Sequence, residues 1–260
     1  MTGTPKVLVT GASGLIGQRV IKDLGERFSF SGLSRRAVDG IPHTQADITD
    51  LDAVRNACRG MDMALHLAAE TIEYDDWDRV MDVTIGGTLN LYRAAQEAGV
   101  KRVVFASAGS TMIGYEWYPG SPYAALAANT IQKLPDGERM LLHTDPPRPA
   151  DFYSVGKLFG ENAGRVFSDK YGMSVIVIRV GAVLPDDTPS LVRELPGYLS
   201  QRDLMAMIDK CRSAPDNLRF DIFHAVSDNS RRWRDIEHAR RILNWTPLDT
   251  SDRFDPATLA

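Results

Sequence analysis

Two side chains capable of acid/base chemistry lie four residues apart in Tyr153-Ser-Val-Gly-Lys157. On one helix, that spacing places a phenol and an ammonium on the same face, so both can point into one cleft. An ordinary tyrosine titrates at about 10, and a neighbouring Lys⁺ favours the phenolate and lowers that pKa. We therefore expect Tyr153 to exchange a proton and Lys157 to support it. Without further context, the same pair would fit an ordinary surface contact.

The context is a glycine-rich turn early in the chain, Thr10-Gly-Ala-Ser-Gly-Leu-Ile-Gly17. It lies between a β-rich run over 6–10 and a helical pattern over 15–26. Glycines at this spacing let the backbone approach a pyrophosphate, and the N–H groups of the helix then face the phosphates. We predict a dinucleotide site here, formed by Gly11, Ser13, Gly14, Leu15, Ile16 and Gly17.

The end of the next strand bears on which dinucleotide is bound. The sequence reads Gly32-Leu-Ser-Arg-Arg36, with no carboxylate before Asp39. NAD sites usually carry Asp or Glu at this point, whereas an Arg nearby accommodates the 2′-phosphate of NADP. We expect Ser34, Arg35 and Arg36 to contact NADP, with NAD as the alternative cofactor and a solvated basic loop as the other interpretation.

A third cofactor contact is expected in Ala46-Asp-Ile-Thr49. Asp47 could accept a hydrogen bond from the adenine amino group, with Ile48 beside it. The alternative is that Asp47 starts a turn before the next helix.

The elements that must position these residues alternate along the chain. We expect strands over 6–10, 28–33, 61–67, 103–107, 174–179 and 220–223, and helices over 15–26, 50–58, 76–98, 153–171, from 200 onward and over 235–243. This order predicts an α/β fold of the Rossmann type, a doubly wound parallel sheet. A dinucleotide-binding domain would span 1–180, with an irregular insertion over 114–149 that closes on the substrate. A small C-terminal substrate-binding region, not independently folded, would follow over 181–260.

Composition narrows the classes of partner. The 260 residues are 43% hydrophobic and 25% charged, with net charge −4 and a pI near 5.8. We expect no nucleic-acid or membrane partner. Cys58 and Cys211 form no CxxC pattern, and no signal peptide is apparent, so we expect a cytoplasmic protein. The five histidines show no ligand spacing, so no metal is expected, and His66 fits a hydrogen-bonded core residue.

Together these motifs resemble the extended short-chain dehydrogenase/reductase family, which includes the NAD-dependent epimerases/dehydratases. The stretches that carry the resemblance are TGASGLIG at 10–17, HLAA at 66–69, VVFAS at 103–107 and YSVGK at 153–157. Within that family, 99–107, 153–161 and 225–229 look most like uronate dehydrogenases. The resemblance implies an oxidoreductase that moves a hydride between nicotinamide and a small polar hydroxyl or carbonyl compound, such as a sugar or sugar acid. It also implies a homodimer formed through the helices over 76–98 and 153–171.

The resemblance adds further expected site residues. Leu67, Ala68, Ala69, Val180 and Val183 would line the cofactor, and Thr71, Ser110, Thr111 and Arg193 would contact the substrate. A serine pair that the family carries after its fourth strand is changed here, because Ala108 stands at the second position. Ser107 or Ser110 must then orient the substrate oxygen, and we favour Ser107.

Three other departures concern positions that the family uses. Thr84 stands where many relatives have Asn, Ala182 where uronate dehydrogenases have Ser, and two arginines where an NAD-linked acid is usual. Two alternatives to the dehydrogenase remain. The first is a nucleotide-sugar epimerase or dehydratase, which usually has a larger C-terminal region. The second is a non-catalytic NADP-binding redox sensor, which commonly lacks the Tyr/Lys pair that this chain keeps.

Overall fold

The structure, a computed structural model, describes residues 4–260 and divides into two compact units. The first unit comprises residues 4–107, 151–177 and 215–221, and the second comprises Ala108–Ala150, Ile178–Ala214 and Ile222–Ala260. This division differs from the expected boundary at residue 180. The second unit takes the expected insertion over 114–149 as well as most of the C-terminal region.

A seven-stranded parallel sheet forms the core, in the order β3-β2-β1-β4-β5-β6-β7. Its strands are β1 Lys6–Thr10, β2 Ser29–Ser34, β3 His43–Gln45, β4 Met63–His66, β5 Arg102–Ala108, β6 Ser174–Val180 and β7 Phe220–Ala225. The strands β1, β4 and β5 are almost wholly buried, as expected for a parallel sheet covered on both faces. The predicted Rossmann-type fold is confirmed. Only the short strand β3 was not expected.

The helices of the first unit begin and end close to the predicted positions. They are α1 Leu15–Leu24, α2 Leu51–Cys58, α3 Trp77–Arg79, the π-helix η1 Val80–Gly86, α4 Gly87–Glu97 and α6 Phe152–Tyr171. The single helix expected over 76–98 is thus a continuous run with a π-helical centre. Asp50, Asp76 and Asp151 cap α2, α3 and α6, each accepting hydrogen bonds from backbone N–H groups of the first turn.

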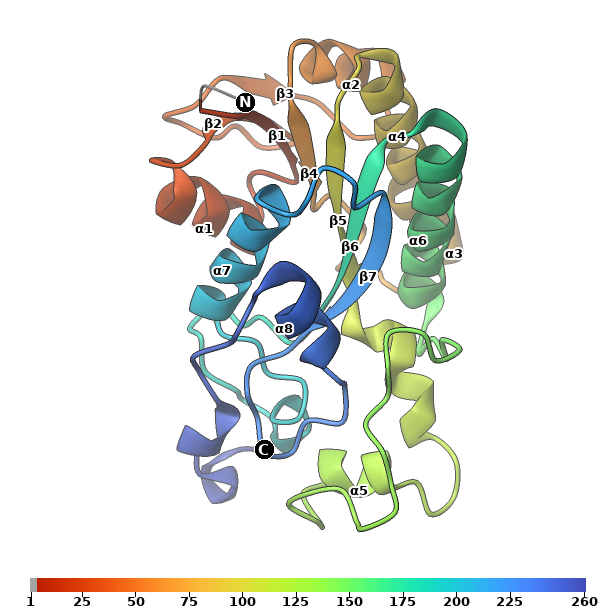
Figure 1. Cartoon of the computed structure of the whole chain (residues 1–260), viewed down its shortest axis with the longest axis vertical. Helices are drawn as coiled ribbons and strands as arrows, with labels where there is room; N and C mark the ends of the chain where they lie inside the picture. The colour runs from red at the N-terminus through yellow and green to blue at the C-terminus, as the bar shows by residue number, and fades with distance from the viewer. Residues whose placement is uncertain (1–3) are drawn as a thin grey trace. The chain divides into compact units, whose positions relative to one another are not determined.

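Three glycines at intervals of four let α6 pack closely on its neighbours. A Cβ at Gly160 would overlap the ring of Phe105 on β5, and one at Gly164 would lie 2.7 Å from the hydroxyl of Tyr92 on α4. At Gly156 it would lie 2.9 Å from a methyl group of Thr84 in η1. α4 and α6 therefore run side by side over one face of the sheet, and α1 covers the other face (Figure 1).

The second unit has a core of its own. Its helices are η2 Gly109–Glu116, α5 Pro122–Ala127, η3 Val192–Glu194, α7 Gln201–Arg212, α8 Glu237–Leu243, η4 Ser251–Arg253 and η5 Pro256–Thr258. Tyr123 and Leu126 of α5 pack with Met112, Leu141 and Trp233 in one buried cluster. The region expected as an irregular loop over 114–149 contains α5 and the end of η2 and otherwise has no helix or named strand. Within it, Tyr123 is buried against Trp233, whereas Trp117 and Tyr118 stay exposed.

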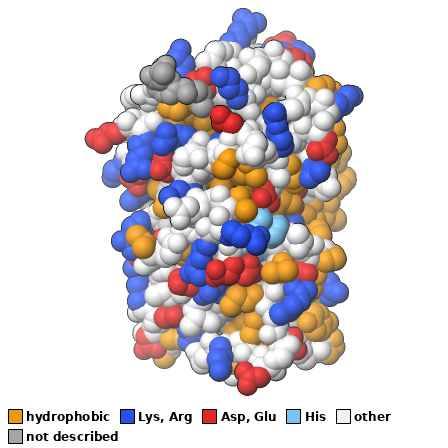
Figure 2. All heavy atoms as spheres, in the orientation of Figure 1, with side chains coloured by type: hydrophobic (Ala, Val, Ile, Leu, Met, Phe, Trp, Pro, Cys, Tyr) orange, Lys and Arg blue, Asp and Glu red, His pale blue; other side chains and the backbone are white. Residues whose placement is uncertain are grey.

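Surface properties agree with the composition. Basic and acidic side chains alternate over the face shown in Figure 2, without a patch of one sign. Among residues 4–260, no helix combines the length and the apolar character that crossing a membrane would need.

His66 ties β1, β4 and α4 together inside the first unit. Its Nδ1 lies 2.6 Å from the Thr10 hydroxyl, and its Nε2 lies 3.0 Å from the hydroxyl of Thr88. Since Thr88 donates its proton to the Thr84 carbonyl, at 2.5 Å, it accepts from Nε2–H, and Nδ1 accepts from Thr10. His66 is thus the hydrogen-bonded core residue that the sequence indicated. Burial, helped by the charge of Lys157, lowers its pKa to about 3.

This histidine should make stability depend on pH. In the unfolded chain the pKa of His66 is about 6.5. Between pH 6.5 and 3, the imidazole therefore binds a proton in the unfolded state and stays neutral in the folded state. Stability contributed by neutral His66 is complete above pH 6.5 and is lost as pH falls. We expect His66→Gln to remove this dependence. From pH 7.5 to pH 5, urea unfolding should show wild type losing about 2 kcal/mol more than the variant. Equal losses would contradict the assignment.

Candidate functional site

The glycine turn has the geometry that a phosphate-binding loop requires. Gly11 has φ +70°, and a Cβ there would lie 2.9 Å from the backbone nitrogen of Ala68. A Cβ at Gly17 would lie 2.5 Å from the Gly11 carbonyl oxygen. α1 then starts at Leu15 with Gly14 as N-cap, and no side chain of the described residues caps it. Its first turn carries no acidic residue, so its N–H groups and positive dipole end suit an anionic ligand.

The two arginines expected at the cofactor follow β2. Arg36 donates from Nη2 to the carbonyl oxygen of Ser13, at 3.2 Å, so its exposed guanidinium lies against the glycine turn. The Ser34 hydroxyl donates to the Arg36 carbonyl, and Gln45 donates to the carbonyl of Arg35. The loop after β2 is therefore held in place by its own polar groups, while both basic side chains stay exposed.

Asp47 adopts the alternative role that the sequence left open. Its Oδ1 accepts from both the backbone N–H and the hydroxyl of Thr49, at 3.0 Å each, and so forms a turn before α2. Asn90 of α4 holds the same loop by donating to the carbonyl of Ile48. The turn does not test the adenine contact, which stays a prediction.

The loop after β4 brings the HLAA segment to the glycine turn. The Ala68 N–H donates to the Thr10 hydroxyl at 3.3 Å, and Leu67 and Ala69 are half-buried beside it. Buried Glu70 organises the following turn, accepting from the N–H groups of Ile72 and Glu73.

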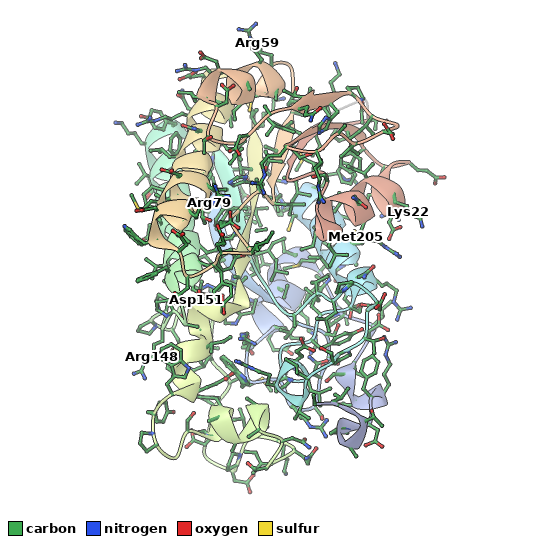
Figure 3. The ribbon with its side chains drawn as sticks, turned by 180° about the vertical axis from the view of Figure 1, so that it is seen from behind. Lys22, Arg59, Arg79, Arg148, Asp151 and Met205 are labelled. Carbon is green, nitrogen blue, oxygen red and sulfur yellow. The ribbon has the colours of Figure 1, made fainter. Side chains whose placement is uncertain are left out.

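Arg79, which Figure 3 labels at the end of α3, completes this turn by donating to Glu70 Oε2 at 2.8 Å. Asp151, also labelled there, caps α6 in the same unit. Thr71 lies exposed next to Glu70.

Tyr153 and Lys157 share one face of α6, as expected. Lys157 is 1% exposed, and its Nζ donates to the Ala106 carbonyl at the end of β5, at 2.7 Å. The same nitrogen lies 5.4 Å from the centre of the Tyr153 ring and 5.1 Å from that of Phe105. Tyr153 is half-buried. The pair thus lies at the carboxyl end of a central strand rather than on the outer surface.

The lowering of the Tyr153 pKa that we expect from Lys157 and an oxidised nicotinamide together stays a prediction. Burial, together with the nearby Asp151 carboxylate, raises the pKa of Tyr153. Lys157 is buried too, and desolvation lowers its own pKa to about 7. At neutral pH the lysine therefore carries only part of the positive charge on which the expectation depended.

Ser107, favoured as the residue that orients the substrate, points to a different partner. Its hydroxyl donates to Glu161 Oε1 at 2.6 Å, and both side chains are buried. A hydroxyl carries only one proton, so in this arrangement Ser107 has no donor left for a substrate oxygen. Sequence reasoning missed Glu161, although it follows Lys157 by the same four residues that separate Lys157 from Tyr153.

Other expected residues belong to the second unit. Thr111 is fully buried and donates its hydroxyl to the Ala108 carbonyl at 2.7 Å. Ser110 is half-buried in η2, and its carbonyl accepts from the Ala150 N–H. Val180 ends β6, and half-buried Val183 follows in the loop. Of these two residues of η2, Ser110 is half-buried and Thr111 is fully buried.

Arg193 lies in a charged cluster of the second unit that the sequence did not reveal. Its Nη2 is 3.7 Å from Glu116 Oε2, a loose ion pair. Glu116 also attracts Arg234, which is 4% exposed, donates to the Gly109 carbonyl at 3.0 Å and stacks 3.9 Å from the centre of the Trp233 ring. Burial raises the pKa of Glu116 and lowers that of Arg234 to about 10.

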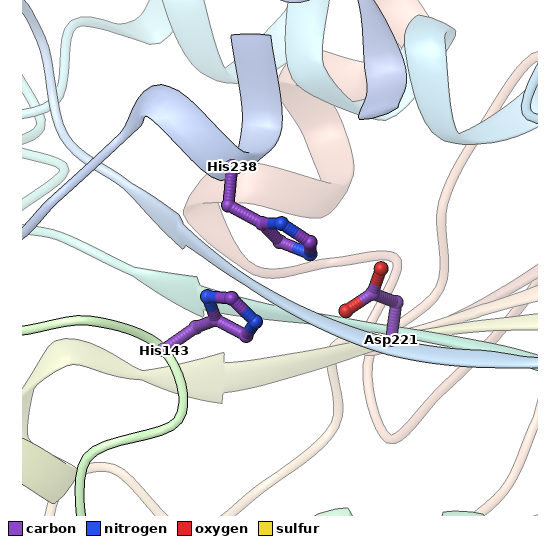
Figure 4. Close-up of side chains that lie close together, drawn as sticks. All are labelled: His143, Asp221 and His238. Atoms are coloured by element: carbon purple, nitrogen blue, oxygen red, sulfur yellow. The ribbon is translucent and has the colours of Figure 1, made fainter. Parts of the chain in front are cut away.

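Two histidines of the second unit, His143 and His238, stack on each other. The ring centres of His143 and His238, both shown in Figure 4, lie 3.7 Å apart. His238 also stacks on Phe223, with ring centres 5.0 Å apart. Arg179 donates to the carbonyl of His143. These imidazoles are packed as aromatic rings within the second unit.

Known proteins resemble this chain over almost its whole length. Residues 7–235 match the NAD dependent epimerase/dehydratase family. The NAD-dependent glucose-6-phosphate dehydrogenase of Haloferax volcanii is 32% identical over 95% of this chain and 95% of its own length. The uronate dehydrogenase of Pseudomonas putida is 30% identical over 100% of this chain and 91% of its own.

A solved structure supports the same relationship. A variant of uronate dehydrogenase from Agrobacterium tumefaciens, complexed with NAD, superposes with a TM-score of 0.82 at 29% identity, covering 98% of this chain and 89% of that one. The family expected from the motifs is confirmed. The chain belongs to the NAD-dependent epimerase/dehydratase family and is an NAD(P)-dependent dehydrogenase of the extended short-chain type.

Proposed function

We propose that this protein oxidises or reduces a small sugar or sugar acid, with Tyr153 as the acid/base and Lys157 as its partner. The observation that carries the proposal is the Tyr153–Lys157 pair, held at the carboxyl end of β5 in a unit that also contains the glycine turn. Ligands of open α/β sheets bind at that edge. Relatives named as uronate, glucose-6-phosphate and L-arabinose dehydrogenases support the substrate class.

The residues fit a nicotinamide dinucleotide. The glycine turn and the uncapped start of α1 would hold the pyrophosphate, and Lys157 would hold the nicotinamide ribose hydroxyls. When bound, the cofactor supplies hydride exchange at its nicotinamide ring and, in its oxidised form, a positive charge.

That charge bears on Tyr153, whose pKa is raised by burial. A cation beside the phenol favours the phenolate, so Tyr153 can take the proton of a substrate hydroxyl during oxidation and return it during reduction. Ser110 is the hydroxyl that we propose to orient the substrate oxygen, because Ser107 donates to Glu161.

We expect Tyr153→Phe to abolish most turnover without loss of cofactor binding. Removing a positioned acid/base should lower kcat by about 100- to 10,000-fold. Steady-state rates with glucuronate, glucose 6-phosphate and L-arabinose would measure the loss, and NAD(P)H fluorescence would measure binding. Tyr74→Phe, an exposed tyrosine of the same unit, is the control and should retain activity. Full activity in Tyr153→Phe would refute the assignment, and cofactor binding without turnover by wild type would favour a sensor.

For the cofactor, we propose a preference for NADP, supported by the exposed guanidinium of Arg36 against the glycine turn and by the absence of an acid at the end of β2. Arg36→Ala should lower kcat/KM with NADP by about 10- to 100-fold, the value of a charge-assisted contact, and leave kcat/KM with NAD nearly unchanged. Arg59→Ala, an arginine remote from this turn in sequence, serves as control. Wild type that prefers NAD would overturn this reading of Arg35 and Arg36.

The cluster around Glu116 supports an anionic substrate. One half-buried carboxyl group faces both Arg193 and the buried Arg234, which leaves an excess of positive charge for a carboxylate or phosphate. Arg193→Met should raise KM for glucuronate or glucose 6-phosphate by about 10- to 100-fold and leave KM for neutral L-arabinose unchanged. Equal effects on charged and neutral sugars would contradict a role in anion recognition.

The expected homodimer stays a prediction. Its support in the structure is the exposure of Trp77, Met81 and Phe152 on α3, η1 and α6, the helices through which the resemblance implies pairing.

A further inference from the structure

The inner face of α6 carries three polar side chains at intervals of four residues, namely Tyr153, Lys157 and Glu161. The proposed chemistry uses the first two and leaves Glu161 without a task. Glu161 is 4% exposed, and carboxyl groups are rarely buried to this extent without a specific partner. Its presence one turn beyond Lys157 therefore needs an explanation.

The partner of Glu161 is Ser107, at the end of β5. The hydroxyl-to-carboxylate distance of 2.6 Å is in the range of short, charge-assisted hydrogen bonds, and Ser107 is 2% exposed. Ser107 is also adjacent in sequence to Ala106, whose carbonyl oxygen accepts from Lys157 Nζ at 2.7 Å. Two buried hydrogen bonds thus join consecutive residues of β5 to consecutive turns of α6.

The covalent geometry of the strand couples these two bonds. The carbonyl oxygen of Ala106 and the backbone nitrogen of Ser107 belong to the same peptide unit, which is planar and rigid. Fixing the Ser107 side chain to Glu161 therefore restricts the orientation of the carbonyl that receives the Lys157 ammonium. We define the clamp as Lys157, the 106–107 peptide, Ser107 and Glu161.

We propose that Ser107 and Glu161 are positioning residues, which hold the Ala106 carbonyl so that it places the Lys157 ammonium beside Tyr153. Ser107 then acts through the clamp and does not contact the substrate. This inference rests on the proposed function for its kinetic readout, but the clamp itself exists independently of turnover.

Other titratable groups face the clamp from each element packed against it. Burial, helped by the Lys157 charge, lowers the pKa of His66 on β4, and burial, helped by the Glu161 charge, raises the pKa of Tyr92 on α4. Tyr92 donates its hydroxyl to the Gly160 carbonyl, next to Glu161. Tyr153 lies one turn before Lys157 on α6. His66 is bonded to the hydroxyls of Thr10 and Thr88, and Tyr92 to the Gly160 carbonyl, so the Ala106 carbonyl is the acceptor that the ammonium uses.

The test compares variants that break the Ser107–Glu161 bond with variants that keep it. Ser107→Ala removes the donor and Glu161→Leu removes the acceptor at similar volume. Ser107→Thr keeps a hydroxyl and Glu161→Gln keeps an oxygen acceptor. Melting temperature and NAD(P)H fluorescence would confirm that each variant folds and binds cofactor.

We expect Ser107→Ala and Glu161→Leu each to lower kcat by about 10- to 100-fold with little change in KM, as for a misplaced catalytic group. The double variant should be no slower than the slower single variant, because both remove one interaction. Ser107→Thr and Glu161→Gln should stay close to wild type. A loss in Ser107→Ala that is absent from Glu161→Leu would overturn the proposal and assign Ser107 to the substrate.

An NMR titration of labelled lysines gives a readout that needs no substrate, with Lys157→Met identifying the Lys157 signal. The wild-type pKa of Lys157 is about 7. Because the bond to the Ala106 carbonyl favours the charged form, we expect Ser107→Ala and Glu161→Leu to lower this pKa by about 1 unit. An unchanged titration in both variants would overturn the proposal. If wild type turned over no sugar, the proposed function would fail while this titration still tested the clamp.

Discussion

An ammonium group buried in a protein must find an acceptor, because the loss of its water shell is expensive unless hydrogen bonds replace it. In this chain the acceptor of Lys157 is a backbone carbonyl at the end of a central strand. The arrangement requires α6 to lie close against β5, and Gly160 makes that approach possible, because a Cβ there would overlap the ring of Phe105. The position of the acid/base pair therefore depends on the close packing of α6 against the buried strand β5.

A second constraint operates at the carboxyl ends of β1 and β4 in the same unit. The turn after β1 is so tight against the loop after β4 that a side chain at Gly11 would meet the backbone of Ala68. The hydrogen bonds of Thr10 to His66 and Ala68 lock the same two loops together.

The sequence predicted those parts that depend on local pattern. Strand and helix order followed from apolar runs and caps, and Asp50 and Ser200 were correctly expected to begin helices. The sequence did not indicate α5, although Ser121 and Pro122 are typical of a helix start. The helix is only 6 residues long, and the Gly and Pro residues around it favour turns.

What the sequence could not predict depended on three-dimensional burial. The burial that raises the pKa of Tyr153 and lowers that of Lys157 is not visible in a spacing of four residues. The partners of Glu161 and Glu116 come from segments far away in the chain, namely Ser107 for the first, and Arg193 and Arg234 for the second. Only a fold brings such groups within range of each other.

The interleaving of the two units along the chain has a consequence for folding. β6 and β7 lie after residue 173, so the sheet of the first unit stays incomplete until most of the polypeptide has been made. Each unit is built from three separated segments, and contacts between distant segments carry a high loop-closure cost that slows folding. During synthesis on the ribosome, β6, the strand that pairs with one edge of β5, emerges some seventy residues after β5. Until then the apolar residues of β5 stay uncovered on that side, and chaperones can bind them.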